Sequence, residues 1–224
     1  MSSLLSVLQI SDSAFPTGSF SYSLGLEASV QYGYTNGTPK FKVFVMSCLE
    51  NAGSFNLPFV RTAYEKSENL NEIRRIDSFS EACVNNHVEN RASRRQGNSL
   101  VDTAIQAFSD ERFQNLQQAI ESQEMRGHFP VIFGCTCAYL NISLDVCLEA
   151  FMFGVLRTVI ASAVRLGTVG SLEGQKCQYD WQKVIPDIIE RNRDKSIEDA
   201  CLSFPLVDIT ENAHDTLFSR LFHS

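Results

Sequence analysis

Three serines at alternate positions, Ser19, Ser21 and Ser23, stand just before Gly25 and come close to the nucleophile elbow of serine hydrolases. That elbow needs glycine where Ser21 stands, and it needs a strand that leads into the turn. A catalytic triad would also need a base from one of the four histidines, His87, His128, His214 or His223. A serine hydrolase using Ser21 or Ser23 therefore stays an alternative. The preferred interpretation is that these small residues allow close helix packing.

The chain has glycines, lysines and cysteines, but not at the spacing that a nucleotide-binding or metal-binding motif requires. Residues 167–176 (Gly-Thr-Val-Gly-Ser-Leu-Glu-Gly-Gln-Lys) have glycines and a lysine, but not in the order of a phosphate-binding loop. Cys135 and Cys137 are two apart in an apolar helical run, so they point to different sides, and no second Cys/His pair follows. We therefore expect no GTP site, no cofactor, no metal site and no catalysis. One alternative is a transient metal site formed by Cys201 with Asp199, His214 or His223.

Arg91, Arg94 and Arg95 fall at positions i, i+3 and i+4 and share one face of a helix. A solvated face paired with glutamates is the structural interpretation. Because the chain as a whole is acidic, a compact basic patch is also a suitable docking site for an acidic protein partner. The spacing of the three arginines fits both interpretations.

Composition limits the class of protein. The chain has 224 residues and is 44% hydrophobic, which is enough to form the core of one large domain. Its net charge of -7 disfavours nucleic-acid partners. Seven cysteines lie in apolar segments, as buried reduced thiols would. The first residues lack a basic leader, and residues 144–166 carry four charges, so we expect a cytoplasmic protein without a membrane span.

The apolar spacing is helical almost everywhere. It predicts helices over residues 58–76, 99–108, 113–120, 131–140 and 144–166, the last one in the core. Capping boxes are expected at residues 78–81 and, more weakly, at 196–199. Residues 34–40, 124–128 and 167–174 read as loops. A solvated helix from Lys183 and a loosely held tail from about residue 205 complete the chain.

Residues 20–32 are ambiguous. Every even position is apolar and nearly every odd one is small or polar, which on period alone favours a strand. As a helix, the same residues would be buried on several sides, which also explains the lack of charge. Met1 to Thr38 contains only two charged side chains, Asp12 and Glu27.

Five separated segments resemble the UreF family of urease accessory proteins. Residues 9–27, centred on Phe-Pro-Thr-Gly-Ser-Phe-Ser-Tyr-Ser-Leu-Gly-Leu-Glu, are similar to its N-terminal signature. The others are residues 91–97 (Arg-Ala-Ser-Arg-Arg-Gln-Gly), 127–134 (Gly-His-Phe-Pro-Val-Ile-Phe-Gly), 164–175 (Val-Arg-Leu through Gly-Gln) and 214–222 (His-Asp-Thr-Leu-Phe-Ser-Arg-Leu-Phe). Position 22 is Tyr where some relatives have His. The resemblance decides residues 20–32 in favour of helix.

The resemblance implies a single-domain, all-α bundle of roughly ten helices with a flexible C-terminal tail. It implies a homodimeric scaffold for nickel insertion that binds UreH (UreD), recruits the GTPase UreG and docks on urease apoprotein. Both termini are poor in charge and rich in aromatics, as interface cores are. The expected partner-binding residues are Phe15, Pro16, Tyr22, Leu24, Leu26, Glu27, Arg91, Arg94, Arg95, Ser219, Arg220 and Leu221. Besides the hydrolase, the alternative is a helical adaptor unrelated to urease.

Overall fold

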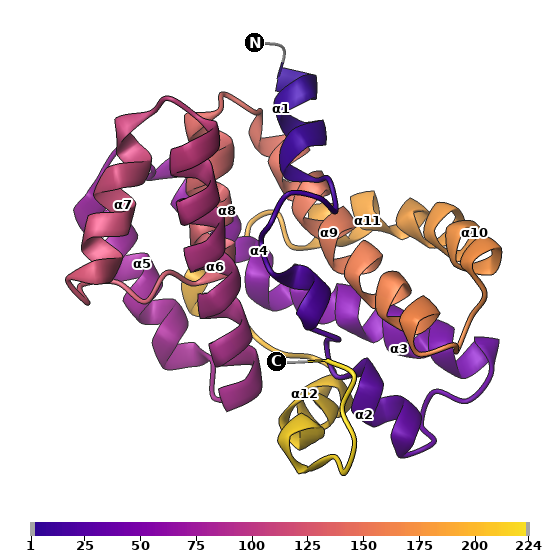
Figure 1. Ribbon diagram of the computed structural model, residues 1–224. Coiled ribbons are helices and arrows are strands. Elements are labelled where there is room, and N and C mark those ends of the chain that lie inside the picture. The colour runs from indigo at the N-terminus through magenta and orange to yellow at the C-terminus, as the bar shows by residue number, and fades with distance from the viewer. Residues whose placement is uncertain (1–2, 223–224) are drawn as a thin grey trace.

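The computed structural model describes residues 3–222, which form twelve α-helices and no strand (Figure 1). The all-α prediction is therefore confirmed. The helices are α1 (Ser3–Ile10), α2 (Leu26–Gln31), α3 (Thr38–Asn51), α4 (Leu57–Glu65), α5 (Leu70–Cys83), α6 (His87–Ala107), α7 (Glu111–Glu121), α8 (Phe129–Tyr139), α9 (Leu144–Arg165), α10 (Ser171–Trp181), α11 (Ile185–Arg191) and α12 (Pro205–Asn212).

Two groups of helices meet at helix α4. In Figure 1, α5, α6, α7 and α8 lie on one side, and α3, α9, α10 and α11 lie on the other. Helix α4 lies between the groups and packs against α8, α5 and α9. One continuous hydrophobic core runs through both groups, and it includes fully buried Phe41, Phe59 and Phe113. The short helices α2 and α12 pack against each other at one edge of this body.

Helix α9 is the expected core helix and begins directly after Ser143. By length and composition alone it could cross a membrane, yet half of its most apolar window is buried inside the protein. It packs against α3, α10, α11, α4 and α8. Because a membrane span would present its apolar surface to lipid instead, these contacts favour a core role.

Two helix boundaries differ from the predictions because asparagine caps interrupt the apolar pattern. The single helix expected over residues 58–76 is two helices, since Asn69 accepts hydrogen bonds from the backbone N–H of Asn71 (3.1 Å) and Glu72 (3.3 Å) and starts α5 anew. The predicted capping box at 78–81 is wrong, because those residues lie inside α5. Asn86 caps α6 instead, so this helix begins at His87, twelve residues before the predicted start at residue 99.

Residues 20–32 are helical only in their second half. A 3-10 turn spans Ser19–Ser21, and α2 begins at Leu26. Between them, Leu24 (φ 52°) and Gly25 (φ 74°) adopt left-handed backbone conformations, which stop a continuous helix. A side chain at Gly25 would also lie 2.7 Å from the Thr210 hydroxyl, so the residue lets α2 approach α12 closely.

The C-terminal segment is anchored, which corrects the prediction of a loosely held tail. Helix α12 and a 3-10 turn at Ala213–Thr216 lead into residues 217–222. Leu217 and Phe222 are buried, the latter with 1% of its surface exposed. Sequence periodicity could not reveal this, because the tail is held by residues nearly two hundred positions away. The predicted capping box at Ser196 is present and opens the 3-10 turn Ile197–Asp199.

Candidate functional site

The side chain of Glu27 on α2 binds the C-terminal tail. Its side chain is 2% exposed, and its carboxylate accepts hydrogen bonds from the backbone N–H of Leu221 (2.6 Å) and of Phe222 (3.3 Å). The Nε2 atom of buried His214 lies 3.4 Å from the same carboxylate. A buried carboxylate needs such partners, because desolvation is costly for an unpaired charge. The acidic residue of the N-terminal signature therefore holds the tail in place.

Asp215 links the tail to helix α6. Its carboxylate accepts hydrogen bonds from Arg91 (Nη2–Oδ1, 3.0 Å) and Arg220 (Nη1–Oδ1, 3.3 Å), and its Oδ2 lies 3.0 Å from Nε2 of His87. The hydrogen bond from Arg91, and after it that from His87, hold the pKa of Asp215 below its ordinary value. Two predicted partner-binding residues from distant parts of the chain, Arg91 and Arg220, thus share one carboxylate.

Arg165, at the end of α9, joins both termini. Its guanidinium lies 3.8 Å from the ring centroid of Phe20 and 4.2 Å from that of Phe222, and is held between the two aromatic rings. It also donates hydrogen bonds to the carbonyl oxygens of Phe20 and Leu221. Arg165 was not among the predicted site residues, although it stands in the segment 164–175 that resembles the family.

The segments 91–97 and 127–134 interlock beneath the basic face of α6. A side chain at Gly97 would lie 2.0 Å from the carbonyl oxygen of Gly127, so only glycine permits this contact. Fully buried His128 places its Nε2 2.7 Å from Glu81. Although burial opposes it, hydrogen bonds from His128 and Asn90 lower the pKa of Glu81. An open groove runs along this face, lined by the three predicted arginines together with Glu81, His87 and Asn98.

The predicted partner-binding residues divide into core and surface. Phe15 stacks on Phe108 with a centroid distance of 6.2 Å, and Leu26 has no exposed surface. With Tyr22 and Glu27, these side chains lie inside the protein, so in this conformation they shape a partner surface only from beneath. Leu24 is half-buried, with its backbone strained. The exposed members of the set are Pro16, Arg95, Ser219, Arg220 and Leu221, and Arg91 and Arg94 are partly exposed.

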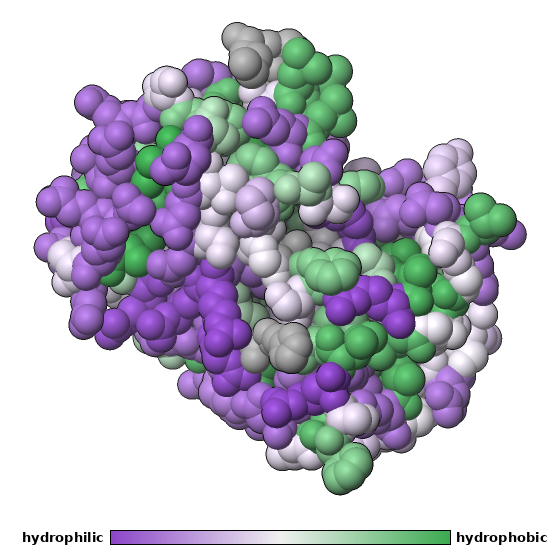
Figure 2. Space-filling view, in the orientation of Figure 1, coloured by the Kyte–Doolittle hydropathy of each residue, from purple (hydrophilic) through white to green (hydrophobic). Residues whose placement is uncertain are grey.

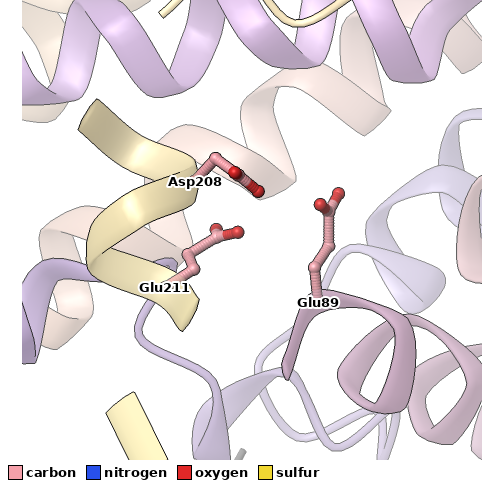
Figure 3. A group of neighbouring side chains, drawn as sticks. All are labelled: Glu89, Asp208 and Glu211. Atoms are coloured by element: carbon pink, nitrogen blue, oxygen red, sulfur yellow. The ribbon is translucent and has the colours of Figure 1, made fainter. Parts of the chain in front are cut away.

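Three carboxylates meet below the tail, where the sequence predicted no site. Glu89 on α6 faces Asp208 and Glu211 on α12, and one oxygen of each lies within 4.8 Å of the others (Figure 3). Burial, and then the charge of Asp208, raise the pKa of Glu89 to about 7. Burial and the charge of Glu89 likewise raise the pKa of Glu211. The sequence shows only that Asp208 and Glu211 share a helix face, since Glu89 lies more than a hundred residues earlier.

Ser21 and Ser23, the candidate nucleophiles of the hydrolase alternative, have no general base beside them among the residues that the structure describes. The Ser21 hydroxyl donates to the carbonyl oxygen of Gly18 at 2.9 Å, and Ser23 is 1% exposed. Among residues 3–222, no histidine forms a hydrogen bond with either serine; His87, His128 and His214 have the partners described above. His223 lies outside the described residues.

The seven cysteines are free thiols, and five of them are buried. Burial raises the pKa of Cys135 and Cys137, which favours the inert protonated thiol expected in a core. Cys201 is exposed, and its backbone carbonyl oxygen accepts a hydrogen bond from the Ser54 hydroxyl. In the part of the chain that the structure describes, no group of three metal-ligating side chains includes Cys201 or His214.

Comparison with known proteins supports the resemblance. The family model UreF matches residues 39–182. Urease accessory protein F of rice (Oryza sativa subsp. japonica) is 34% identical over 222 residues, covering 98% of this chain and 85% of the relative. The Arabidopsis thaliana protein of the same name is 31% identical over 96% of this chain and 90% of the relative. Urease accessory protein UreF of Trichodesmium erythraeum is 28% identical over 99% and 97%. The chain therefore belongs to the UreF family of urease accessory proteins.

Proposed function

We propose that this protein is a homodimeric scaffold in the cytoplasm that binds UreH (UreD), recruits the GTPase UreG and docks the assembly on urease apoprotein for nickel insertion. In this role the chain performs no catalytic step of its own. Membership of the urease accessory family supports the general role. The seven free thiols agree with a reducing compartment.

The observation that carries the proposal is the junction of the two termini, which we call the tail junction: Phe20 and Glu27 with residues 213–222, held by Arg91 and Arg165. It joins four of the five segments that resemble the family. Its outer surface carries several exposed apolar side chains. Phe218 is fully exposed, Phe20 is 71% exposed and Leu221 is 47% exposed, and the side chain of Arg220, which pairs with Asp215, is 45% exposed.

Such a surface is suited to protein partners. Aromatic residues and arginine are enriched in interface cores, and they form most binding hot spots. The face drawn in Figure 2 is mainly hydrophilic over α5, α6 and α7, and carries hydrophobic patches over α1 and around α2 and α9. On α1, Leu4, Leu5 and Leu8 are each more than half exposed, which supplies further apolar area for the proposed homodimer.

Co-purification with UreH (UreD) tests the role of the tail junction. Phe218→Asp changes a side chain without buried surface, so the variant should fold normally and lose the partner. Leu172→Asp on α10 is the matched control, because Leu172 is 89% exposed and lies outside the junction. The proposal expects retention by the control and loss by Phe218→Asp. Equal retention by both variants would exclude the tail junction as the docking surface.

A further inference from the structure

The three carboxylates of Glu89, Asp208 and Glu211 form an acidic cluster without a countercharge. Asp208 and Glu211 project from one face of α12, and Glu89 projects toward them from the first turn of α6 (Figure 3). None of the three forms an ion pair with a described residue. Repulsion between carboxylates at this distance disfavours the packing of α12 on α6 unless a proton or a cation is held between them.

A cavity of about 40 Å³ borders all three carboxylates, and Leu24, Cys48, Asn51, Asn56 and Val155 are among its other lining residues. This volume holds one ion with a few waters, since a water needs roughly 10–15 Å³. Asn56 ends a π-helical turn, Ala52–Asn56, a rare conformation that occurs often at functional sites. Glu89 also borders a second cavity of about 110 Å³.

A second, independent observation points to a ligand. Tyr22 is 8% exposed, and its buried hydroxyl forms no hydrogen bond of normal length and angle. The side chain packs against Val88 and Ala92 on either side of Glu89, and its hydroxyl lies near Glu211. A buried polar atom without a partner is rare in folded proteins and calls for an explanation. Because its neighbour is Glu211, this hydroxyl lies at the acidic cluster, without a well-formed hydrogen bond there.

We propose that Glu89, Asp208 and Glu211 bind one divalent cation through oxygen ligands, with Tyr22 and water completing the surroundings. Oxygen ligands of this kind suit Mg²⁺, Mn²⁺ and Ca²⁺. Asn86 supports the site, because its Nδ2 donates to Oδ1 of Asp208 at 3.0 Å and thereby orients this ligand. The ion would fasten α12 to α6 just ahead of His214 and Asp215, the residues that begin the tail junction.

Mn²⁺ titration of the full chain, followed by electron paramagnetic resonance, tests this proposal. Free Mn²⁺ gives a strong signal that is lost on binding, and sulfur-rich or histidine-rich sites compete poorly for this ion. The wild-type protein should bind one Mn²⁺ per chain, and Mg²⁺ or Ca²⁺ should displace it. Glu211→Gln and Asp208→Asn should abolish binding. Glu121→Gln, at an exposed acid on α7, is the control and should bind as the wild type does.

Thermal unfolding separates a lost ligand from a lost fold. In EDTA, Glu211→Gln should melt at or above the wild-type temperature, since it removes repulsion without removing volume. Added Mn²⁺ should then raise the Tm of the wild type and of Glu121→Gln only. The proposal is overturned if the wild type binds no Mn²⁺ at millimolar concentration, or if folded Glu211→Gln and Asp208→Asn bind it equally. Binding of Ni²⁺ without any binding of Mn²⁺ also contradicts it, since that pattern indicates nitrogen or sulfur ligands.

Discussion

Glu27→Gln is the substitution that most directly probes how the tail is held. It preserves the shape of the side chain and removes the charge that accepts hydrogen bonds from the backbone N–H of Leu221 (2.6 Å) and Phe222 (3.3 Å). The Gln amide keeps one neutral acceptor and turns its NH₂ group toward the other backbone N–H. One of the two hydrogen bonds is therefore lost, and the remaining one is weakened.

The magnitude follows from these contacts. Hydrogen bonds to a charged acceptor contribute about 1.5–3 kcal/mol each, and neutral ones about 1 kcal/mol. The longer bond belongs at the low end of that range, and burial of an amide costs less than burial of a carboxylate, which offsets part of the loss. We expect the free energy of unfolding to fall by about 2 kcal/mol.

Urea denaturation of the full chain measures this change. With a slope near 2 kcal/mol per molar urea, the midpoint should shift down by about 1 M. Hydrogen exchange should show faster exchange of the Leu221 and Phe222 amides in the variant. Glu121→Gln serves as the control and should lie within about 0.5 kcal/mol of the wild type. An unchanged midpoint together with continued protection of both amides would refute the conclusion that Glu27 binds the tail.

Three further substitutions probe the same network. Because the pKa of Asp215 is lowered in the folded protein, its stabilising contribution is present above its ordinary pKa of about 3.9 and disappears as the pH falls through the lower folded value. Below pH 4, Tm should therefore fall less steeply with pH in Asp215→Asn than in the wild type. Parallel curves of Tm against pH for the two proteins in this range would contradict this. Gly97→Ala places a methyl group against the carbonyl oxygen of Gly127, which should destabilise the fold by about 1–3 kcal/mol in urea denaturation, and a wild-type midpoint would show that the two segments separate easily. Arg220 is 45% exposed and pairs with Asp215, so Arg220→Ala should leave Tm nearly unchanged while reducing recruitment of UreG in a pull-down; undiminished recruitment would exclude Arg220 from that interface.

Much of the helical architecture could be predicted from apolar spacing, because burial imposes a 3.6-residue period. Residues 144–166, where charges are few, agree closely with α9. Boundaries set by a single asparagine were missed, as at Asn69, because the apolar period continues on both sides of the cap. The alternation in residues 20–32 misled because these residues are buried around left-handed turns, which belong to neither regular period.

The candidate site was only partly predictable. Charge-poor, aromatic termini indicated contact surfaces, but not that the two termini contact each other. Glu27 and Leu221 are 194 positions apart, and no local pattern reports a hydrogen bond of that kind. For the same reason Arg91 and Arg220 looked like separate basic features, although both bind Asp215. The carboxylate cluster combines residues from α6 and α12, and no sequence motif predicts it.

We propose that this chain is the scaffold through which a urease is activated. The most direct test is reconstitution of urease apoprotein with UreH (UreD), UreG, GTP, bicarbonate and nickel, in the presence and absence of the purified chain, with urea hydrolysis as the readout. The scaffold account predicts strong activation only when the wild-type chain is present, little activation with Phe218→Asp, and full activation with Leu172→Asp. Equal activation with and without the chain would contradict the account.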